Sequence, residues 1–313
     1  MSTHIILHNY PQSPVAEKVR VAFGLKDLAW SDVEIPRLPP KPMLTALTGG
    51  YRRTPVMQIG ADIYCDSQCI LREIDRRFPD KPFMPTADAG LLWCLSRWTD
   101  GALFELAVKI VLGAAGDKLD PEFAKDRGQL YLGDDWAAGL AAANKQLPHL
   151  VSQLRAPLSW LDNMLGDDRR FLTGDQSSAL DAQVYHVVWF IRGRWDGGPA
   201  ALGEFNHLCR WESAIKAIGH GQVRTLSPEQ AIHAAATATP QTEEAVHGVE
   251  PQGLSCGMVV SVCPDVPSNE QAVEGRLRFA SADTIAIDRH CDETGTMVCV
   301  HFPRSGYRVE VLS

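Results

Sequence analysis

The periodicity of apolar residues changes twice along the 313 residues of this chain, and each change marks a different kind of fold. In roughly the first 80 residues, apolar runs of strand length alternate with helical patterns. From 88 to about 236 the pattern is helical almost throughout and contains no convincing strand. Short alternating runs rich in valine and isoleucine follow. The sequence therefore predicts an α/β domain, then an all-α domain, then a small all-β module.

The domain boundaries are predicted from these changes of pattern. The stretch 237–252 loses its apolar residues and gains Pro, Gly, Thr and Glu, which is the composition of a linker. We expect domains at 1–83, 84–236 and 253–313, with this linker before the last one. Five short strands are predicted after the linker, namely "MVVSVC", "GRLRFA", "TIAID", "MVCVHF" and "YRVEVL". Turn signals between them suggest a small β-barrel or a two-layer β module, and we predict an SH3-like barrel.

Local signals place the first elements on the chain. Two helix starts in the helical region carry the capping-box spacing, one at Ser178 with Asp181 and one at Ser227 with Gln230. Apolar runs and breaker residues define the elements of the first domain. They are a strand at 4–8, a helix from Pro14 to about Leu25, a strand at 28–35, two strands within 55–65 and a helix from after Ser67 to Pro79.

Charge and composition exclude several classes of function. The formal net charge of -8 and the pI near 5.7 argue against a partner that is bound through its phosphates. Apolar runs are far shorter than the roughly 20 residues that span a bilayer, and the N-terminus shows no signal-peptide pattern. Eight scattered cysteines are typical of reduced thiols. We therefore expect a cytoplasmic protein that binds neither nucleic acid nor membrane.

Ser13 stands directly before a proline that opens a helical pattern, in "YPQSPVAEKVR". Serine is a preferred N-cap residue, and proline is favoured at the first helical position. A hydroxyl at a helix N-terminus could also stabilise a bound anion such as a thiolate, because the free N–H groups and the helix dipole favour negative charge there. The two interpretations are compatible with each other.

Three motifs, taken in order, resemble the cytosolic glutathione S-transferase family over roughly 1–220. "SPVAEKVRVAF" resembles the active-site turn and first helix of the classes that use Ser or Cys, with Ser13 at the catalytic position, as in bacterial members with a serine-type active site. "RRTPVMQIGADIYCDS" resembles the glutathione-binding core, where family members carry a cis-proline and later an acidic residue followed by serine. "FLTGDQSSALD" resembles the capping box of the helical domain. The resemblance implies a thioredoxin-like domain followed by an all-α domain, and glutathione as the co-substrate.

The resemblance also implies a set of glutathione-binding residues. The backbone of Thr54, before Pro55, would pair with the cysteinyl part of the peptide as an added strand. Asp66 and Ser67, at a helix N-terminus, would hold the ammonium and carboxylate of the γ-glutamyl group. Arg53 would meet a carboxylate of the peptide. Taken singly, these residues could equally be a turn, a cap and a surface charge.

In the mechanism that the resemblance implies, the glutathione thiolate attacks an apolar electrophile. Ser13 would donate a hydrogen bond that favours the thiolate, and Tyr10 is the alternative donor. Tyr10, Trp98 and Phe104 would line the pocket of the second substrate, although helical-domain aromatics more often belong to a core.

Other chemistries lack their sequence patterns. The cysteines and histidines of the C-terminal module show no paired metal-ligand spacing, so we expect no metal. Hydrolase, NTPase and dinucleotide-binding motifs are absent from the sequence. We therefore predict a homodimeric glutathione transferase with an appended β module. The alternative is a protein of the same fold that binds glutathione or a partner without turnover.

Overall fold

The computed structural model describes residues 4–84, 89–166, 169–266 and 270–312. Its contacts divide the chain into two compact units. Unit 1 comprises Met1–Val19, Leu28–Arg77 and Gln222–Ser313, and unit 2 comprises Arg20–Asp27 and Phe78–Gly221. The first and last parts of the chain therefore share one unit. The boundaries predicted from the sequence pattern instead treat them as separate domains.

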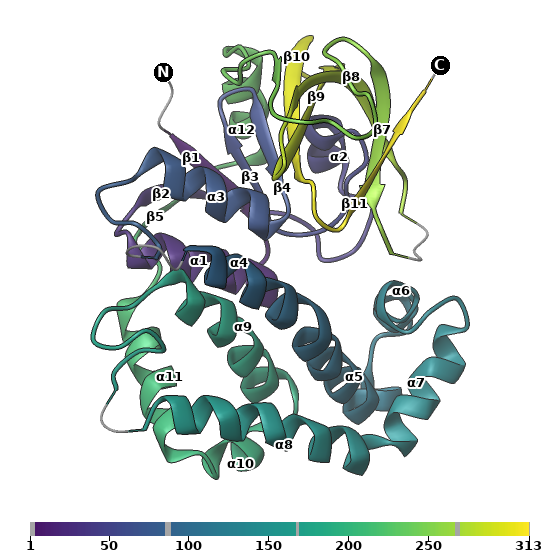
Figure 1. Cartoon of the computed structure of the whole chain (residues 1–313). Coiled ribbons are helices and arrows are strands. Elements are labelled where there is room, and N and C mark those ends of the chain that lie inside the picture. The colour runs from purple at the N-terminus through teal and green to yellow at the C-terminus, as the bar shows by residue number, and fades with distance from the viewer. Residues whose placement is uncertain (1–3, 85–88, 167–168, 267–269, 313) are drawn as a thin grey trace. The chain divides into compact units, whose positions relative to one another are not determined.

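Unit 1 is built on one open sheet (Figure 1). The order of its strands is β11-β7-β8-β9-β10-β4-β3-β1-β2-β5, and β6 pairs with β8. The N-terminal strands are β1 (Ile5–Asn9), β2 (Ala29–Glu34), β3 (Val56–Ile59) and β4 (Asp62–Cys65), followed later in the chain by β5 (Gln222–Thr225). The C-terminal strands are β6 (Ala245–Val246), β7 (Val259–Pro264), β8 (Val273–Ala280), β9 (Thr284–Cys291), β10 (Thr296–Pro303) and β11 (Tyr307–Val311).

The C-terminal strands continue the N-terminal sheet. β10 pairs with β4 in parallel, and the register places Cys299 opposite Asp62 and His301 opposite Tyr64. All five strands predicted for this part are present. The predicted SH3-like barrel is not confirmed, because these strands follow one another in an open order whose outer strand is β11. The sequence patterns of these strands could not reveal that β10, which pairs with β9 along one edge, pairs with β4 along the other.

One hydrophobic core serves both halves of the sheet. Helices α2 (Pro42–Thr48) and α12 (Pro228–Ala236) contribute to it together with the alternate residues of the strands. Ile63 of β4 and Val300 and Phe302 of β10 belong to the same buried cluster. Helix α3 (Ser67–Arg77) contacts β3, β4 and β10. The remaining helix that begins in this unit is α1 (Pro14–Leu25).

Local sequence signals predicted most elements of the first domain. Helix α1 begins at Pro14, and β3 and β4 form a hairpin that turns at Gly60. The prediction of no strand between 88 and 236 is wrong, because β5 pairs in parallel with β2. All four residues of β5 are exposed, so the strand lacks the apolar alternation that would reveal it. Helix α2 was not predicted either.

Unit 2 is helical. Its described elements are α4 (Ala89–Trp98), η1 (Thr99–Leu103), α5 (Phe104–Ala115), η2 (Gly116–Lys118), α6 (Pro121–Tyr131), α7 (Trp136–Lys145), α8 (Leu147–Met164), α9 (Ala179–Arg194), α10 (Gly198–Gly203) and α11 (Asn206–Ile218). The predicted capping box at the start of α9 is confirmed, because Ser178 and Asp181 bond to each other's backbone. Asp181 also accepts hydrogen bonds from Leu172 N and Trp211 Nε1 at 2.9 and 2.8 Å. This carboxylate therefore joins three parts of unit 2.

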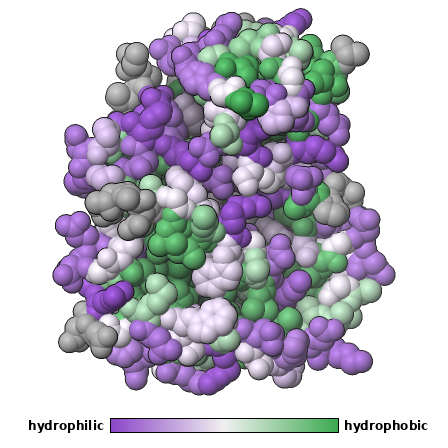
Figure 2. Space-filling view, in the orientation of Figure 1, coloured by the Kyte–Doolittle hydropathy of each residue, from purple (hydrophilic) through white to green (hydrophobic). Residues whose placement is uncertain are grey.

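The surface is mixed in character. Figure 2 shows hydrophobic side chains between hydrophilic ones on the viewed face. Among the large hydrophobic residues that are exposed in unit 2 are Leu91, Trp160 and Met164. Within the described ranges, no helix has both the length and the apolar character needed to cross a bilayer.

Phe302→Ala tests whether the C-terminal strands share the core of unit 1. Phe302 is fully buried and its ring lies 6.0 Å from that of Tyr51, which belongs to the N-terminal half. We expect the substitution to lower the free energy of unfolding by about 3–5 kcal/mol, because it leaves a cavity. Denaturant titration followed by circular dichroism measures this. Val311→Ala, at a half-exposed position of β11, is the control, and a loss below about 1 kcal/mol for Phe302→Ala would contradict the shared core.

Candidate functional site

The hairpin register gathers most of the predicted site residues of unit 1 at one end of the sheet. Val56 at the start of β3 pairs with His8 of β1 and with Cys65 at the end of β4. The chain segments just beyond these pairs therefore meet at the same edge. The predicted residues in these segments are Tyr10, Ser13, Arg53, Thr54, Pro55, Asp66 and Ser67.

Ser13 caps helix α1. Its Oγ accepts a hydrogen bond from Ala16 N at 3.2 Å, and its carbonyl accepts one from Glu17 N at 3.0 Å. The side chain is buried, with 2% of the residue exposed. No bond donated by the Ser13 hydroxyl is found among the described residues. The capping role leaves the hydroxyl hydrogen available, because the cap uses only the oxygen as an acceptor.

Thr54 offers backbone groups to a ligand. The Thr54–Pro55 peptide bond is cis, as the resemblance implies. Among the described residues, neither the N–H nor the C=O of Thr54 forms a backbone hydrogen bond. The Thr54 side chain is held by Lys41, whose Nζ donates to Thr54 Oγ1 at 3.0 Å and to Arg52 O at 3.1 Å. An extended peptide could therefore add to this segment as a strand does.

Lys41 is a site residue that the sequence analysis missed. It is buried, and its ammonium lies 5.7 Å from the centre of the Tyr10 ring. It precedes Pro42, the first residue of α2, and this unpredicted helix brings it to the site. The signal in the sequence was a lysine before a helix-opening proline, which is too common to be decisive. Tyr10 itself lies in the hydrophobic core of unit 1.

Asp66, rather than Ser67, caps helix α3. Asp66 Oδ1 accepts a hydrogen bond from Gln68 N at 2.8 Å, and its carbonyl accepts one from Ile70 N at 3.0 Å. Its φ of 73° lies in the left-handed region, which is uncommon for a residue other than glycine. Such outliers cluster at functional sites. Ser67 follows as the first, buried residue of the helix.

Arg53 forms an ion pair with Glu270, which lies between β7 and β8. Arg53 Nε donates to both carboxylate oxygens of Glu270, at 2.8 and 2.9 Å, and Nη2 donates to Oε2 as well. The side chain of Glu270 is 4% exposed and that of Arg53 is 31% exposed. The predicted carboxylate-binding residue thus binds a carboxylate of the chain itself.

Tyr307, the first residue of β11, contacts Asp66, the residue predicted to bind the γ-glutamyl group. Its hydroxyl donates to Asp66 Oδ2 at 3.1 Å and lies 3.2 Å from the hydroxyl of Tyr51. Burial and the charge of Asp66 raise the pKa of both tyrosines well above the usual value. Tyr307 therefore stays protonated and remains a hydrogen-bond donor to this carboxylate.

Trp98 and Phe104, the other predicted pocket residues, lie in unit 2. Trp98 ends helix α4 and is partly buried, and Phe104 begins α5. The ring of Phe104 packs with His186 at 5.5 Å and with Phe190 at 5.8 Å between centres. Phe104 is 6% exposed, so it belongs to the interior of the helical unit.

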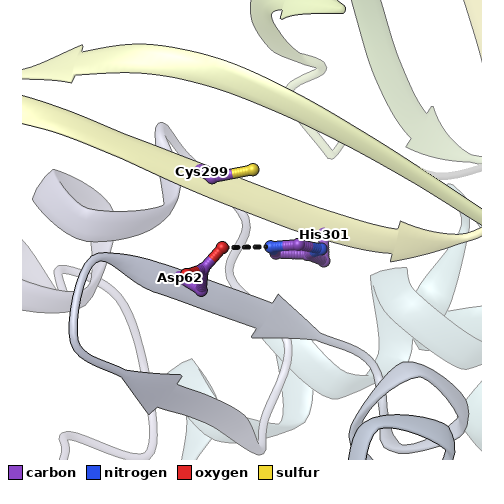
Figure 3. Close-up of side chains that lie close together, drawn as sticks. All are labelled: Asp62, Cys299 and His301. Carbon is purple, nitrogen blue, oxygen red and sulfur yellow. Dashed lines mark hydrogen bonds and ion pairs between the residues drawn. The ribbon is translucent and has the colours of Figure 1, made fainter. Parts of the chain in front are cut away.

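Asp62, Cys299 and His301 form the group of described residues that could supply ligands to a metal ion (Figure 3). They are buried, and their ligand atoms lie within 4.8 Å of one another. Asp62 Oδ1 bonds to His301 Nε2 at 2.9 Å and accepts from Thr242 Oγ1 at 3.0 Å, and Oδ2 accepts from Gln241 N at 2.7 Å. Because these bonds already satisfy the carboxylate, we interpret the group as a buried cross-link between β4 and β10.

Comparisons with known proteins agree with this architecture. The family described as "Glutathione S-transferase, N-terminal domain" matches residues 7–82. A crystal structure of a GST-like protein from Pseudomonas syringae is 34% identical, covers 100% of both chains and superposes with a TM-score of 0.77. The chain belongs to the glutathione S-transferase family. The full coverage extends this relationship to the C-terminal strands as well.

More distant members of this family share the fold. A glutathione S-transferase from Rhodospirillum rubrum F11 is 16% identical, with a TM-score of 0.51, covering 76% of this chain and 94% of its own. A family member from Pseudomonas fluorescens pf-5, whose structure contains two bound glutathione molecules, is 14% identical and has a TM-score of 0.51. It covers 68% of this chain and 91% of its own. No curated protein matches the chain significantly.

Asp62→Asn tests the cross-link between β4 and β10. Burial raises the pKa of Asp62, but the hydrogen bonds from His301, Gln241 and Thr242 outweigh it and leave this pKa below the usual 3.8. The carboxylate therefore stabilises the fold above that unfolded-state pKa, and its contribution is lost as the pH falls through the lower folded-state pKa. At pH 7 we expect the substitution to lower the free energy of unfolding by about 1–3 kcal/mol.

Denaturant titrations of the native chain and Asp62→Asn between about pH 7 and pH 3 measure this difference. We expect it to shrink only at the acid end. The exposed Asp292→Asn is the control, since its side chain is 96% exposed. A difference between the native chain and Asp62→Asn that stays constant over the whole range would contradict the assignment of the stabilising charge to Asp62.

Proposed function

We propose that this chain is a glutathione transferase that activates the glutathione thiol for attack on an apolar electrophile. The observation that carries the proposal is the edge of the sheet beyond β1, β3 and β4. There the register gathers a helix-capping hydroxyl, Ser13, a segment whose backbone groups form no hydrogen bond among the described residues, Thr54, and a carboxylate at a helix N-terminus, Asp66. Family membership supports glutathione as the ligand of this edge.

Glutathione would bind here as a short added strand. Its cysteinyl N–H and C=O would pair with the backbone groups of Thr54, which have no backbone partner in the described part of the chain, and this pairing would fix the direction of the peptide. Its γ-glutamyl ammonium would meet Asp66, and its γ-glutamyl carboxylate would meet the first N–H groups of α3 beside Ser67. Arg53 would hold a carboxylate of the peptide.

Thiol activation follows from the groups around the cysteinyl position. A free thiol has a pKa of about 8.5, and hydrogen bonds, helix N-termini and nearby cations lower it. Ser13 would donate its hydroxyl hydrogen to the sulfur, and the N-terminus of α1 would favour the thiolate. Lys41 adds a buried ammonium beside Thr54. The thiolate would then form a bond to an electrophilic carbon and displace its leaving group.

A second candidate function is glutathione or partner binding without turnover. It is favoured by the contacts of Arg53 with Glu270 and of Asp66 with Tyr307, which engage two proposed ligand-binding side chains within the chain. Assay of conjugation with a panel of apolar electrophiles separates the two functions when combined with a binding measurement. A homodimeric state and a cytoplasmic location stay predictions of the sequence.

Substitutions of Ser13 test its catalytic role separately from its capping role. Ser13→Ala removes both the hydroxyl and the cap, which costs about 1 kcal/mol of stability, whereas Ser13→Gly removes the hydroxyl at a cost of only a few tenths. We expect both variants to lose about tenfold or more in turnover, because each pKa unit added to the bound thiol reduces the thiolate about tenfold near neutral pH. Their affinity for glutathione should change little.

Turnover, calorimetric affinity and the ultraviolet absorbance of the thiolate as a function of pH measure these effects. Unequal losses of turnover that follow the stability of the two variants would assign Ser13 to capping alone. Unchanged turnover in both variants would contradict the hydroxyl's role.

Asp66→Asn tests the γ-glutamyl site. Asparagine caps a helix as well as aspartate does, so α3 should keep its start while the negative charge is lost. We expect glutathione affinity to fall about tenfold or more, because a charge-assisted bond to the ammonium is replaced by a neutral one. Calorimetry measures the affinity, with Asp75→Asn on the same helix as the control. An unchanged affinity would remove Asp66 from the binding site.

A further inference from the structure

Side chains from the C-terminal part of the chain contact the loop 49–54 and the start of α3. Glu270 binds Arg53, and Tyr307 donates to Asp66 and contacts Tyr51. Arg289 of β9 donates from Nη1 to the carbonyl of Ala46 in helix α2 just before this loop. All these residues belong to unit 1, whose halves share one sheet and one core.

The contacts of Arg53 with Glu270 and of Asp66 with Tyr307 resemble those that the two ends of glutathione would make. The peptide presents carboxylates, and Glu270 presents a carboxylate to Arg53. The peptide also presents an ammonium donor, and Tyr307 presents a hydroxyl donor to Asp66. The middle of the site differs, because the backbone groups of Thr54 take no such internal partner among the described residues. The chain thus fills the two charged ends of the site and leaves its backbone part open.

Glu270 and a carboxylate of glutathione cannot both bind the same edge of Arg53. The guanidinium edge formed by Nε and Nη2 holds both oxygens of Glu270, so a second carboxylate cannot use that edge at the same time. At Asp66, Oδ1 is used by the cap of α3 and Oδ2 by the hydroxyl of Tyr307. An ammonium would therefore have to replace the hydroxyl or share the oxygen with it.

We propose that Glu270 and Tyr307 act as an internal competitor for glutathione, so that the peptide binds only when these two side chains leave Arg53 and Asp66. The proposal rests on the proposed function of this site. Release does not require the shared sheet to open. Glu270 lies in no strand, and Tyr307 begins β11, the outer strand of the sheet, which pairs only with β7 among the described strands.

Competition lowers the apparent affinity of the site without changing its intrinsic affinity. The measured dissociation constant equals the intrinsic one divided by the fraction of molecules whose site is open. Conservative substitutions that remove the internal contacts should therefore tighten binding. Glu270→Gln removes the charge that pairs with Arg53, and Tyr307→Phe removes the hydroxyl that donates to Asp66.

Calorimetric titration of the full chain with glutathione tests the proposal. The variants are Glu270→Gln, Tyr307→Phe and the double variant, and circular dichroism and melting temperatures establish that each is folded. We expect the double variant to bind glutathione about tenfold tighter or more than the native chain. The matched control is Glu310→Gln, because Glu310 lies on the same strand as Tyr307 and is exposed. Its affinity should equal that of the native chain.

The outcomes separate this proposal from the proposed function. Equal affinities of the native chain and the double variant would overturn the internal competition and leave glutathione binding intact. Absence of binding in both would overturn the proposed function, and the competition with it. If Tyr307→Phe fails to fold, Glu270→Gln alone carries the test, with the same expected direction.

Hydrogen exchange gives a second measurement on the native chain. Saturating glutathione should speed the exchange of amides in β11 if its first residue leaves Asp66, because that contact anchors an outer strand. Amides of the inner strand β10 should not change. Exchange in β11 that stays the same while glutathione is bound would contradict displacement of Tyr307.

Discussion

The parallel pairing of β10 with β4 is the interaction on which the arrangement of unit 1 depends. It sets Cys299 opposite Asp62 and His301 opposite Tyr64, and it joins strands that are more than 200 residues apart in the sequence. The buried bond between Asp62 and His301 specifies this register. A slip of one residue would turn His301 toward the apolar core that holds Val300, where an imidazole would lack its carboxylate partner.

This pairing brings the C-terminal strands to the edge where the candidate site lies. Residues of the loop 49–54 leave room for the C-terminal part of the chain or contact it. Gly49 has a φ of 77°, and a Cβ atom there would come within 2.5 Å of Arg289 Nε on β9. Gly50 faces the side chain of Gln271, and Tyr51 meets Tyr307. Four of the five residues in the "GGYRR" sequence before Thr54 therefore contact residues from the other end of the chain.

Elements set by local chemistry could be predicted, whereas long-range contacts could not. Pro14 opens α1, and the pairs Ser178–Asp181 and Ser227–Gln230 form capping boxes as their spacing indicates. The same reasoning interpreted the C-terminal strands as a closed barrel, because alternation shows that a strand has two faces but not which neighbour lies at its edge. Arg53 matched a ligand-binding position, yet nothing near it in the sequence indicates Glu270 as its partner.

The strength of the Arg53–Glu270 ion pair decides whether Arg53 can both bind Glu270 in the free chain and release it to bind a ligand. An exposed ion pair contributes little, and a fully buried one is costly to break. This pair lies between these limits, with Glu270 nearly buried and Arg53 about a third exposed. The internal carboxylate is also always present, at an effective concentration of about millimolar or more. In the proposed binding mode, glutathione would also contact the Thr54 backbone and the Ser13 hydroxyl, which Glu270 and Tyr307 do not contact. In this proposal, these added contacts would allow the peptide to displace Glu270 and Tyr307, which contact only the residues that would bind its two ends.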